Sequence, residues 1–536
     1  MVIAQPLLPQ ELAQYDLGSQ DPDTRELFAR KVERYVYFTA RPYVDSLPST
    51  ERPDDQAGQC THFRGASIDP TPNWPTTAPD SSPALAPIEP GHARVYSCGP
   101  TVYAPQHIGN LRAYLMADLL RRALEAEGLR VTHVINITDV GHLVSDADAG
   151  EDKLEKAAAS SGRSAADIAA EYTSQWRRDC ARVNCLEACV YCRATDHIAE
   201  QIALARTLEA KGYTYRIDDG LYFDVSKFPR YAEFAHLDLA GQEAGARIGD
   251  VAGKRHAADF ALWKFAAPGV KRQQEWDSPW GRGFPGWHLE CSAMSTKYLG
   301  APFDIHTGGV DHIAVHHTNE IAQSECALDV HPWVRFWLHN EFYDFGGEKM
   351  SKSKGNLLVL QDLVDRGLEP LAFRYFFLQG HYRQQQAFTL EAMEAAATGY
   401  RRLLGAAAEV RGAAGTPNEA AIAPYRARFR EAVRDDLNAP RALAVAWEAA
   451  RSPELGPADR RALLLGFDAF LGLDLATATP RAAEAESDPR IDALVAEREQ
   501  ARKRRDFAAA DRVRDALAAE GIVIEDTPAG PRWRRA

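Results

Sequence analysis

The segment Cys98-Gly-Pro-Thr-Val-Tyr-Ala-Pro-Gln-His107-Ile-Gly-Asn110 turns the chain from a predicted strand into a predicted helix. Residues 93–97 alternate as a short strand does, and apolar residues then recur at helical spacing as far as Gly128, a residue type typical of helix ends. His107 would therefore open a helix, whose free N–H groups and partial positive charge favour a bound phosphate. Gly109 would let such a ligand approach the backbone closely.

The fold class predicted for the 536-residue chain is α/β, with a Rossmann-like, doubly wound catalytic domain. A strand, a helix and a second strand follow one another from residue 93, and beyond residue 385 the apolar residues keep a helical period. We expect an N-terminal appendage with a Pro-rich segment (1–90), two halves of the catalytic domain (91–164 and 286–384), an inserted connective domain (165–285), a helical bundle (385–480) and an all-α C-terminal region (481–536).

Composition limits the class of protein. No run approaches the roughly 18 apolar residues of a membrane span, and the first residues lack a secretory pattern, so we expect a cytoplasmic protein without a membrane partner. Eight cysteines in so long a chain suggest reduced thiols or metal ligands. The net charge of −13 argues against a globally basic nucleic-acid binder, but the last 46 residues hold ten Lys/Arg against nine Asp/Glu. The lack of a long apolar heptad run favours a monomer.

A second segment, Lys349-Met-Ser-Lys-Ser-Lys-Gly-Asn356, places three lysines among small residues. Lysines in a loop suit a pyrophosphate leaving group, on which negative charge builds during the reaction. The chain resembles the class I aminoacyl-tRNA synthetases, whose His-Ile-Gly-His and Lys-Met-Ser-Lys-Ser signatures flank the ATP site. Here Asn110 replaces the second histidine of the first signature, and so keeps hydrogen-bonding capacity without charge. The resemblance implies that the catalytic residues are His107, Asn110, Lys349 and Lys352.

The nucleotide contacts also follow from this resemblance. Gly308-Gly309-Val-Asp311 is similar to the Gly-Gly-x-Asp of class I enzymes, in which glycines approach the adenosine and the acid reaches the ribose hydroxyls. ATP with magnesium would be the substrate. The implied nucleotide-binding residues are Gly109, Gly308, Gly309, Asp311 and Lys352.

Two thiols, an imidazole and a carboxylate form a candidate metal site. Cys98 ends a predicted strand, Cys291 follows Gly286-Trp-His-Leu-Glu290, and His316 and Glu320 share a helix face at i and i+4. Thiolates and imidazole select zinc over magnesium. Buried free cysteines and a helical His–Glu contact remain the alternative. A rival site is the group Cys180, Cys185, Cys189 and Cys192, which contains one CxxC and could hold a structural metal or stay reduced.

Three segments narrow the resemblance to the cysteinyl-tRNA synthetase family: Cys98 to Tyr103, Gly286 to Met294 and His316 to Glu320. The resemblance covers the chain from about residue 92 onwards. It implies one zinc ion held by Cys98, Cys291, His316 and Glu320, which binds the thiolate of the substrate. Four protein ligands and the substrate make five, whereas catalytic zinc usually keeps an open position, so we predict that Glu320, the hard oxygen ligand, is the weakest or most mobile. The partners would be L-cysteine, ATP and tRNA(Cys). The implied amino-acid contacts are Gly99, Thr101, Thr138 and Trp287.

Such a metal answers a problem of selectivity. Serine and cysteine differ by one atom, and a pocket that selects by shape separates similar analogues by only ~10–200-fold. A zinc–thiolate bond adds discrimination because a serine hydroxyl is neither soft nor ionised at neutral pH.

The C-terminal region is where RNA recognition is expected. Arg502-Lys-Arg-Arg505 joins two predicted helices, and Arg532-Trp-Arg-Arg535 sets an aromatic ring among cations, where it could stack on an unpaired base. The family resemblance makes residues 481–536 an expected anticodon-binding region. The candidate tRNA contacts are Arg502, Asp511 and Trp533.

Three other functions share some of these features. A cysteine ligase of mycothiol synthesis would use the same ATP and zinc sites but lack the helical extension after residue 385. A non-catalytic RNA-binding paralogue conflicts with the retained His107, Lys349 and Lys352. A generic nucleotidyltransferase would not explain the metal ligand set.

Overall fold

The computed structural model describes residues 86–141, 152–237, 253–267, 269–270, 272–346, 358–479, 489–527 and 530–535. Almost all of the expected N-terminal appendage lies outside the described residues. So do Lys349 and Lys352 and the rest of the segment 347–357.

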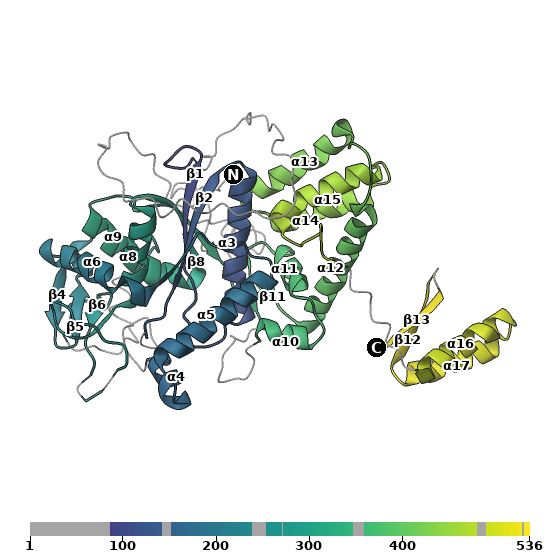
Figure 1. Cartoon of the computed structure of the whole chain (residues 1–536), viewed down its shortest axis with the longest axis horizontal. Helices are drawn as coiled ribbons and strands as arrows, with labels where there is room; N and C mark the ends of the chain where they lie inside the picture. The colour runs from purple at the N-terminus through teal and green to yellow at the C-terminus, as the bar shows by residue number, and fades with distance from the viewer. Residues whose placement is uncertain are drawn as a thin grey trace, which may run out of the picture.

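A five-stranded parallel sheet forms the centre of the catalytic region (Figure 1). Its strands, in spatial order, are β3 (Val190–Arg193), β2 (Arg130–Ile137), β1 (His92–Ser97), β8 (Phe303–Gly309) and β9 (Val334–Asn340). This order places β1 in the middle, with the chain winding outwards in both directions, as in a Rossmann-like fold. The predicted α/β, doubly wound fold class is confirmed.

Helix α3 (Ile108–Ala126) follows β1 and packs its apolar face on one side of the sheet. Leu111, Leu115 and Leu119 recur at helical spacing and are fully buried, as the sequence predicts. Gly128 lies just past the helix with a φ of +82°, a conformation that residues with a Cβ rarely adopt. Because α3 begins at the end of β1, its N-terminus lies at the carboxyl edge of the sheet, where α/β proteins bind ligands.

The other face of the sheet carries a second core. Tyr96 and Val134 contribute to it from the strands, whereas Val95 and Ile135 point to the α3 side, as alternation along a strand requires. The helices that share this second core are α6 (Ile198–Ala210), α8 (Trp287–Leu299) and α9 (Thr318–Leu328).

The range 165–285, predicted as an insertion, contains two different structures. α5 (Ala165–Arg182), preceded by α4 (Lys153–Ser161), leads into β3, which is an edge strand of the central sheet rather than part of a separate unit. The later part builds a small antiparallel sheet of β4 (Thr214–Ile217), β5 (Gly220–Phe223), β6 (Phe260–Lys264) and β7 (Phe284–Pro285). A turn at residues 218–219 joins β4 to β5, and Ile217 pairs with Gly220, so that Gly220 begins β5.

A helical bundle follows the catalytic sheet. Its helices are α10 (Leu360–Asp365), α11 (Pro370–Leu378), α12 (Leu390–Arg411), α13 (Glu419–Arg434), α14 (Ala439–Arg451) and α15 (Pro457–Leu471), and two short parallel strands, β10 (Tyr343–Asp344) and β11 (Gln386–Ala387), lie at its start. α3 shares one hydrophobic core with this bundle. A buried ion cluster also joins them, because Asp118 of α3 accepts hydrogen bonds from Arg122 at 2.8 Å and from Arg374 of α11 at 2.5 Å.

The C-terminal residues form a small separate unit in Figure 1. Helices α16 (Pro489–Lys503) and α17 (Phe507–Ala519) pack against the antiparallel hairpin of β12 (Ile522–Thr527) and β13 (Gly530–Arg535). The sequence predicted the helices but not the hairpin, whose strands are rich in arginine and acidic residues and show no clean alternation. Ile491, Val495, Leu517 and Ile522 form its core.

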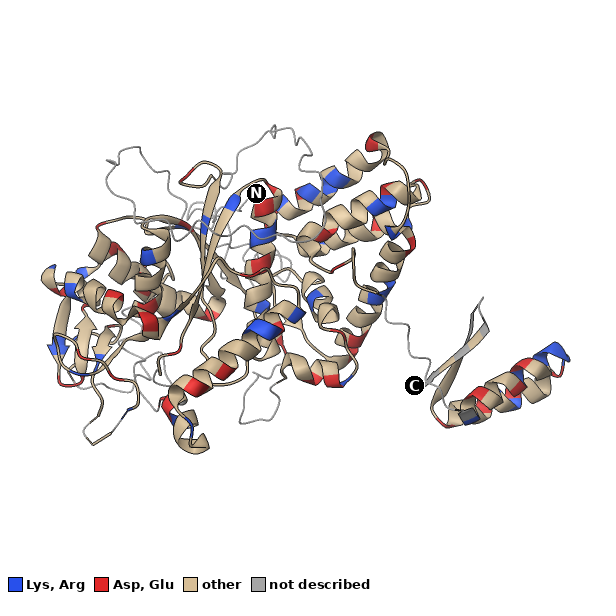
Figure 2. Ribbon diagram, viewed as in Figure 1, with Lys and Arg blue, Asp and Glu red and all other residues tan. Residues whose placement is uncertain are grey.

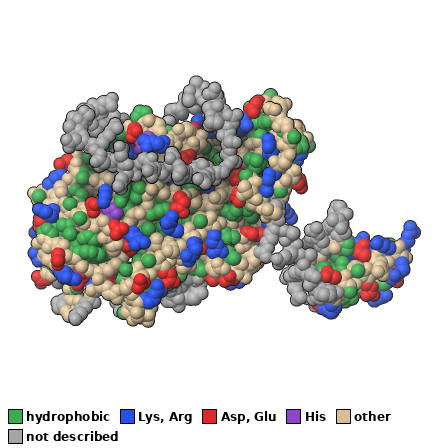
Figure 3. Space-filling model, viewed as in Figure 1, with side chains coloured by type: hydrophobic (Ala, Val, Ile, Leu, Met, Phe, Trp, Pro, Cys, Tyr) green, Lys and Arg blue, Asp and Glu red, His purple; other side chains and the backbone are tan. Residues whose placement is uncertain are grey.

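Charges of both signs are interspersed along the chain (Figure 2). On the face seen in Figure 3, no large area carries a single sign. Among the described residues, no helix has the length and apolar character needed to cross a membrane.

Candidate active site

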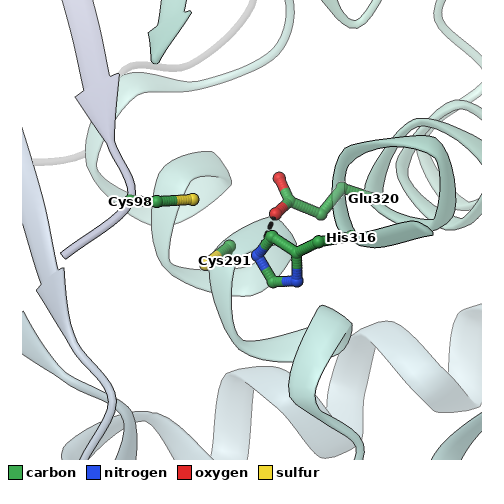
Figure 4. Close-up of side chains that lie close together, drawn as sticks. All are labelled: Cys98, Cys291, His316 and Glu320. Carbon is green, nitrogen blue, oxygen red and sulfur yellow. Dashed lines mark ion pairs between the residues drawn. The ribbon is translucent and has the colours of Figure 1, made fainter. Parts of the chain in front are cut away.

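The four predicted metal ligands converge, although they come from distant parts of the chain (Figure 4). Cys98 follows β1, Cys291 lies on α8, His316 lies in a five-residue π-helical turn (Ile313–His317), and Glu320 lies in the first turn of α9. Their four ligand atoms all lie within 4.8 Å of one another, and all four residues are buried. π-Helical turns are rare and occur often at functional sites.

His316 and Glu320 form a close buried pair, with 2.6 Å between Nε2 and Oε1. Burial alone would raise the pKa of Glu320, but the adjacent His316 and His306 lower it to about 2. Burial likewise disfavours the charged imidazole, yet Glu320 and Cys98 raise the pKa of His316 to about 10. The carboxylate is therefore ionised at neutral pH and available as a ligand.

The two thiols face one another across the same centre. Burial opposes ionisation of Cys98, but a hydrogen bond from Cys291 and the nearby His312 and His317 hold the pKa of Cys98 well below its usual range. The hydrogen bond to Cys98, together with burial, raises the pKa of Cys291 well above its usual range.

Sequence reasoning missed a layer of histidines around these ligands. His306 Nε2 lies 2.8 Å from Glu320 Oε2, and His288 Nδ1 lies 2.9 Å from His316 Nδ1, so both side chains fix the orientation of a ligand. His317 lies 3.4 Å from the Cys98 sulfur. Because Ile305 packs in the core on the α3 side of the sheet, alternation along β8 could have predicted that His306 points to the opposite side.

The residues present fit a zinc ion. The four donors are two sulfurs, one imidazole and one carboxylate oxygen, a set of the borderline-soft character that zinc prefers. Holding two thiolates beside a buried carboxylate also costs free energy unless a cation is present. Among the described residues, the rival group of Cys180, Cys185, Cys189 and Cys192 gives no such cluster of donors. The described cysteines form no disulfide.

The predicted amino-acid contacts lie just after β1 and β2 and at the start of α8. Thr101 and Thr138 pair in an isolated parallel bridge, and the Gly99 N–H donates to Asn136 Oδ1 at 2.8 Å. A Cβ on Gly99 would stand 1.6 Å from the Asn136 carbonyl oxygen, so only glycine fits there. The centroid of the Trp287 ring lies 4.4 Å from the centroid of the ring of His316, one of the candidate metal ligands.

Asn110 helps to cap the N-terminus of α3. The His107 ring accepts a hydrogen bond from the Asn110 N–H at 3.2 Å, and Asn110 Oδ1 accepts one from the His107 N–H at 3.3 Å. This reciprocal arrangement is a capping box, which satisfies two N–H groups of the helix end. Because Nδ1 of His107 is the acceptor, the neutral ring carries its proton on Nε2.

The predicted Gly308, Gly309 and Asp311 lie where β8 ends and a short 3₁₀ turn begins. A Cβ on Gly308 would stand 2.7 Å from atoms of both His312 and His317, so this glycine lets the histidines approach the strand end. At Gly309 a Cβ would stand 2.3 Å from Asp311 Oδ1. This segment therefore lies at the carboxyl edge of the sheet, next to the candidate metal centre.

The candidate tRNA contacts all lie in the C-terminal unit. Arg502, near the end of α16, is 3.2 Å from Glu499, and Asp511 on α17 is 3.0 Å from Arg514. Trp533 is only partly exposed, because its ring packs on the core of the unit and its indole N–H donates to Asp492 at 2.7 Å.

Known proteins share the fold of this chain. The chain's fold matches that of the Mycobacterium tuberculosis methionyl-tRNA synthetase bound by methionyl-adenylate, with a TM-score of 0.51 and 17% identity, covering 78% of this chain and 96% of that one. It also matches the agnB2 LeuRS of Agrobacterium radiobacter K84 in a ternary complex with tRNA and LeuAMS, with a TM-score of 0.53 and 12% identity over 72% of this chain and 84% of that one. The family model for the tRNA synthetases class I (C) catalytic domain matches residues 84–398. Fold and sequence thus define a class I aminoacyl-tRNA synthetase.

The narrower family follows from the C-terminal unit and the curated relatives. The family model for the cysteinyl-tRNA ligase anticodon binding domain matches residues 484–534. Cysteine–tRNA ligase 1 of Burkholderia lata is 52% identical over 450 residues, covering 84% of this chain and 93% of that one. Cysteine–tRNA ligase of Thermus thermophilus is 42% identical over 84% of this chain and 96% of its own. This chain belongs to the cysteine–tRNA ligase family, and none of the comparisons favours the alternative functions.

Proposed function

We propose that this protein activates L-cysteine with ATP to cysteinyl-adenylate and transfers the cysteine to tRNA(Cys). The observation that supports the proposal most directly is the convergence of Cys98, Cys291, His316 and Glu320 at the carboxyl edge of a parallel sheet, beside the start of α3. A nucleotide-binding fold alone would not require two buried thiols at that edge.

Zinc is the metal we assign to these four residues, and when bound it would supply a soft Lewis acid that accepts a substrate thiolate. Trp287 stands beside His316 and would exclude water from the amino-acid side chain. Gly99, Thr101 and Thr138 would hold the polar end of the amino acid near the strand edge. Serine would fit this pocket by shape but lose the sulfur contact.

Adenylation needs no general base, because the substrate carboxylate is ionised at neutral pH. The protein would then need only to position ATP and to stabilise the negative charge that develops on the phosphates. His107 would donate from Nε2 to a phosphate oxygen at the N-terminus of α3, where the helix dipole also favours negative charge. Gly308, Gly309 and Asp311 would hold the adenosine, with Lys349 and Lys352 neutralising the pyrophosphate of the magnesium complex.

The C-terminal unit would recognise the anticodon, with Arg502, Asp511 and Trp533 as the candidate contacts. We further propose that the protein acts as a cytoplasmic monomer. The domain boundaries that we propose are those expected from the sequence, with β3 assigned to the catalytic sheet.

Cysteine-dependent ATP–pyrophosphate exchange tests the adenylation step. We expect exchange with cysteine, little exchange with serine, and loss of exchange when a chelator removes zinc. Restoration by added zinc would separate metal loss from unfolding. A protein that binds zinc and folds, yet gives no exchange, would overturn the enzymatic proposal and favour an RNA-binding paralogue. Charging of tRNA(Cys) tests the second step, the transfer of cysteine to the tRNA.

A further inference from the structure

We propose that Cys180 and Cys185, at the end of α5, form a redox-active pair that a peroxide oxidises reversibly to a disulfide. Neither residue contributes to the candidate metal centre, and the family resemblance assigns them no role. The proposal rests on the backbone geometry that brings these two residues together and on their unequal burial.

The end of α5 is a Schellman motif. The Cys185 N–H donates to the Cys180 carbonyl at 2.9 Å, the Asn184 N–H donates to the Ala181 carbonyl at 3.0 Å, and Asn184 has a φ of +57°. In this motif the side chains of the first and sixth residues commonly touch. Here both positions hold cysteine. The hydrogen bond from Cys185 to Cys180 also keeps their Cα atoms within the ~7 Å that a disulfide tolerates.

The two thiols contact one another and differ in environment. Cys180 is buried, whereas Cys185 is only partly buried. Burial, with the hydrogen bond to Cys185, raises the pKa of the Cys180 thiol well above its usual range. Cys185 is therefore the thiol that a small oxidant can reach, and Cys180 is a protonated neighbour in position to resolve the product.

The oxidation proceeds in two balanced steps. The Cys185 sulfur attacks one oxygen of hydrogen peroxide, the O–O bond breaks, and the products are a sulfenic acid and water. The Cys180 sulfur then attacks the Cys185 sulfur, the S–O bond breaks, and a second water leaves with the thiol proton. Peroxide gains the two electrons that the thiols lose, and an added dithiol reverses the change.

The surrounding contacts hold this turn in place. The Asn184 carbonyl accepts hydrogen bonds from Arg122 at 2.7 Å and from Arg374 at 3.2 Å, and its side-chain amide donates to the Gly472 carbonyl at 2.8 Å. The next N–H, that of Leu186, donates to Asp118 at 2.7 Å. Because these bonds join the turn to α3 and to the bundle, the cysteines stay adjacent while the protein is folded.

Peptide mapping of the zinc-loaded, full-length protein tests the proposal. The folded protein is treated with hydrogen peroxide, its free thiols are alkylated under denaturing conditions, and trypsin is added without reductant. Because Arg182 lies between the two cysteines, trypsin separates residues 179–182 from residues 183–193 unless a disulfide joins them. We expect a several-fold rise in the joined peptides after peroxide, and their disappearance after dithiothreitol.

Two variants complete the test. Cys189→Ser removes another cysteine of the second peptide and should leave the linkage intact, which excludes that residue as the partner. Cys180→Ser should abolish the linkage and let Cys185 proceed to sulfinic acid. Recovery of Cys180 as alkylated thiol while other cysteines are oxidised, or its linkage to Cys192 instead, would overturn the proposal.

Discussion

His107 and Val359 pair in an isolated antiparallel β-bridge, and the adjacent Ile108 N–H donates to the Leu358 carbonyl at 2.9 Å. The first described residues after the lysine segment, Leu358 and Val359, are therefore attached directly to the start of α3. The His107 backbone takes part in this bridge while its side chain caps α3. Leu358 and Val359 thus lie beside the turn where we expect the phosphates to bind.

The capping box at α3 predicts what Asn110 contributes. Asn110→Ala should lower stability by about 1 kcal/mol, because the His107 N–H loses its acceptor, and should raise the KM for ATP. Asn110→Asp keeps an acceptor oxygen and is the matched control. Denaturant unfolding and pyrophosphate exchange measure the two effects. An alanine variant with unchanged stability and KM would show that the capping box is dispensable.

Lys352 is predicted to act mainly in the transition state. Lys352→Ala should lower kcat for pyrophosphate exchange by about 10²–10³-fold and change the KM for cysteine little, as expected when a preorganised charge is removed. Lys354→Ala, in the same segment, should have a much smaller effect. Equal losses in the two variants would indicate that only the net charge of the segment matters.

The metal ligands are predicted to differ in strength. Cys291→Ser should remove most bound zinc, because a hydroxyl replaces a thiolate, whereas Glu320→Gln should retain zinc with weakened affinity. Cys326→Ser changes a buried cysteine outside the candidate centre and should keep full zinc content. Zinc stoichiometry and the cysteine-to-serine exchange ratio are the readouts. Full zinc in Cys291→Ser would contradict the assigned ligand set.

The buried Asp118 predicts an acid-sensitive contact between α3 and the bundle. Burial would raise the pKa of this carboxyl, but Arg374 and Arg122 lower it below the usual value. Its stabilising contribution is therefore complete above the unfolded pKa of about 3.9 and is lost as the pH falls through the lower, folded pKa. Asp118→Asn should cost about 3–5 kcal/mol at pH 7, because two buried arginines lose their partner.

Thermal unfolding across the acid range tests this sign. The difference in Tm between the wild type and Asp118→Asn should be large at pH 7 and shrink below pH ~4. Asp329→Asn removes an exposed partner of Lys211 and should change stability by less than about 1 kcal/mol. A Tm difference for Asp118→Asn that stays constant down to pH 2 would show that its charge is not the cause.

Variants of Trp533 should distinguish RNA recognition from amino-acid activation. Trp533→Ala should leave pyrophosphate exchange unchanged and lower kcat/KM for tRNA charging by about tenfold or more, because a base would lose its stacking partner. Trp533→Phe loses the indole bond to Asp492 but keeps a ring, and should retain most of the charging activity. Unchanged charging in the alanine variant would remove Trp533 from the set of tRNA contacts.

The sequence determined the local features of this protein. Three of them could be predicted: the β1–turn–α3 unit, the glycine past α3, and the i, i+4 pair of His316 and Glu320. They could be predicted because periodicity and turn chemistry depend on neighbouring residues. The signature segments likewise indicated the four candidate metal ligands, whose donor atoms lie close together in the structure.

The tertiary structure alone decided which distant residues meet. It brought His306 to Glu320, placed β3 in the central sheet and attached Leu358 to the turn before α3. It also formed the β12–β13 hairpin, whose strands lack the simple alternation of apolar and polar residues that would predict their pairing. These contacts depend on burial and strand pairing between segments far apart in the chain, so local sequence carries little information about them.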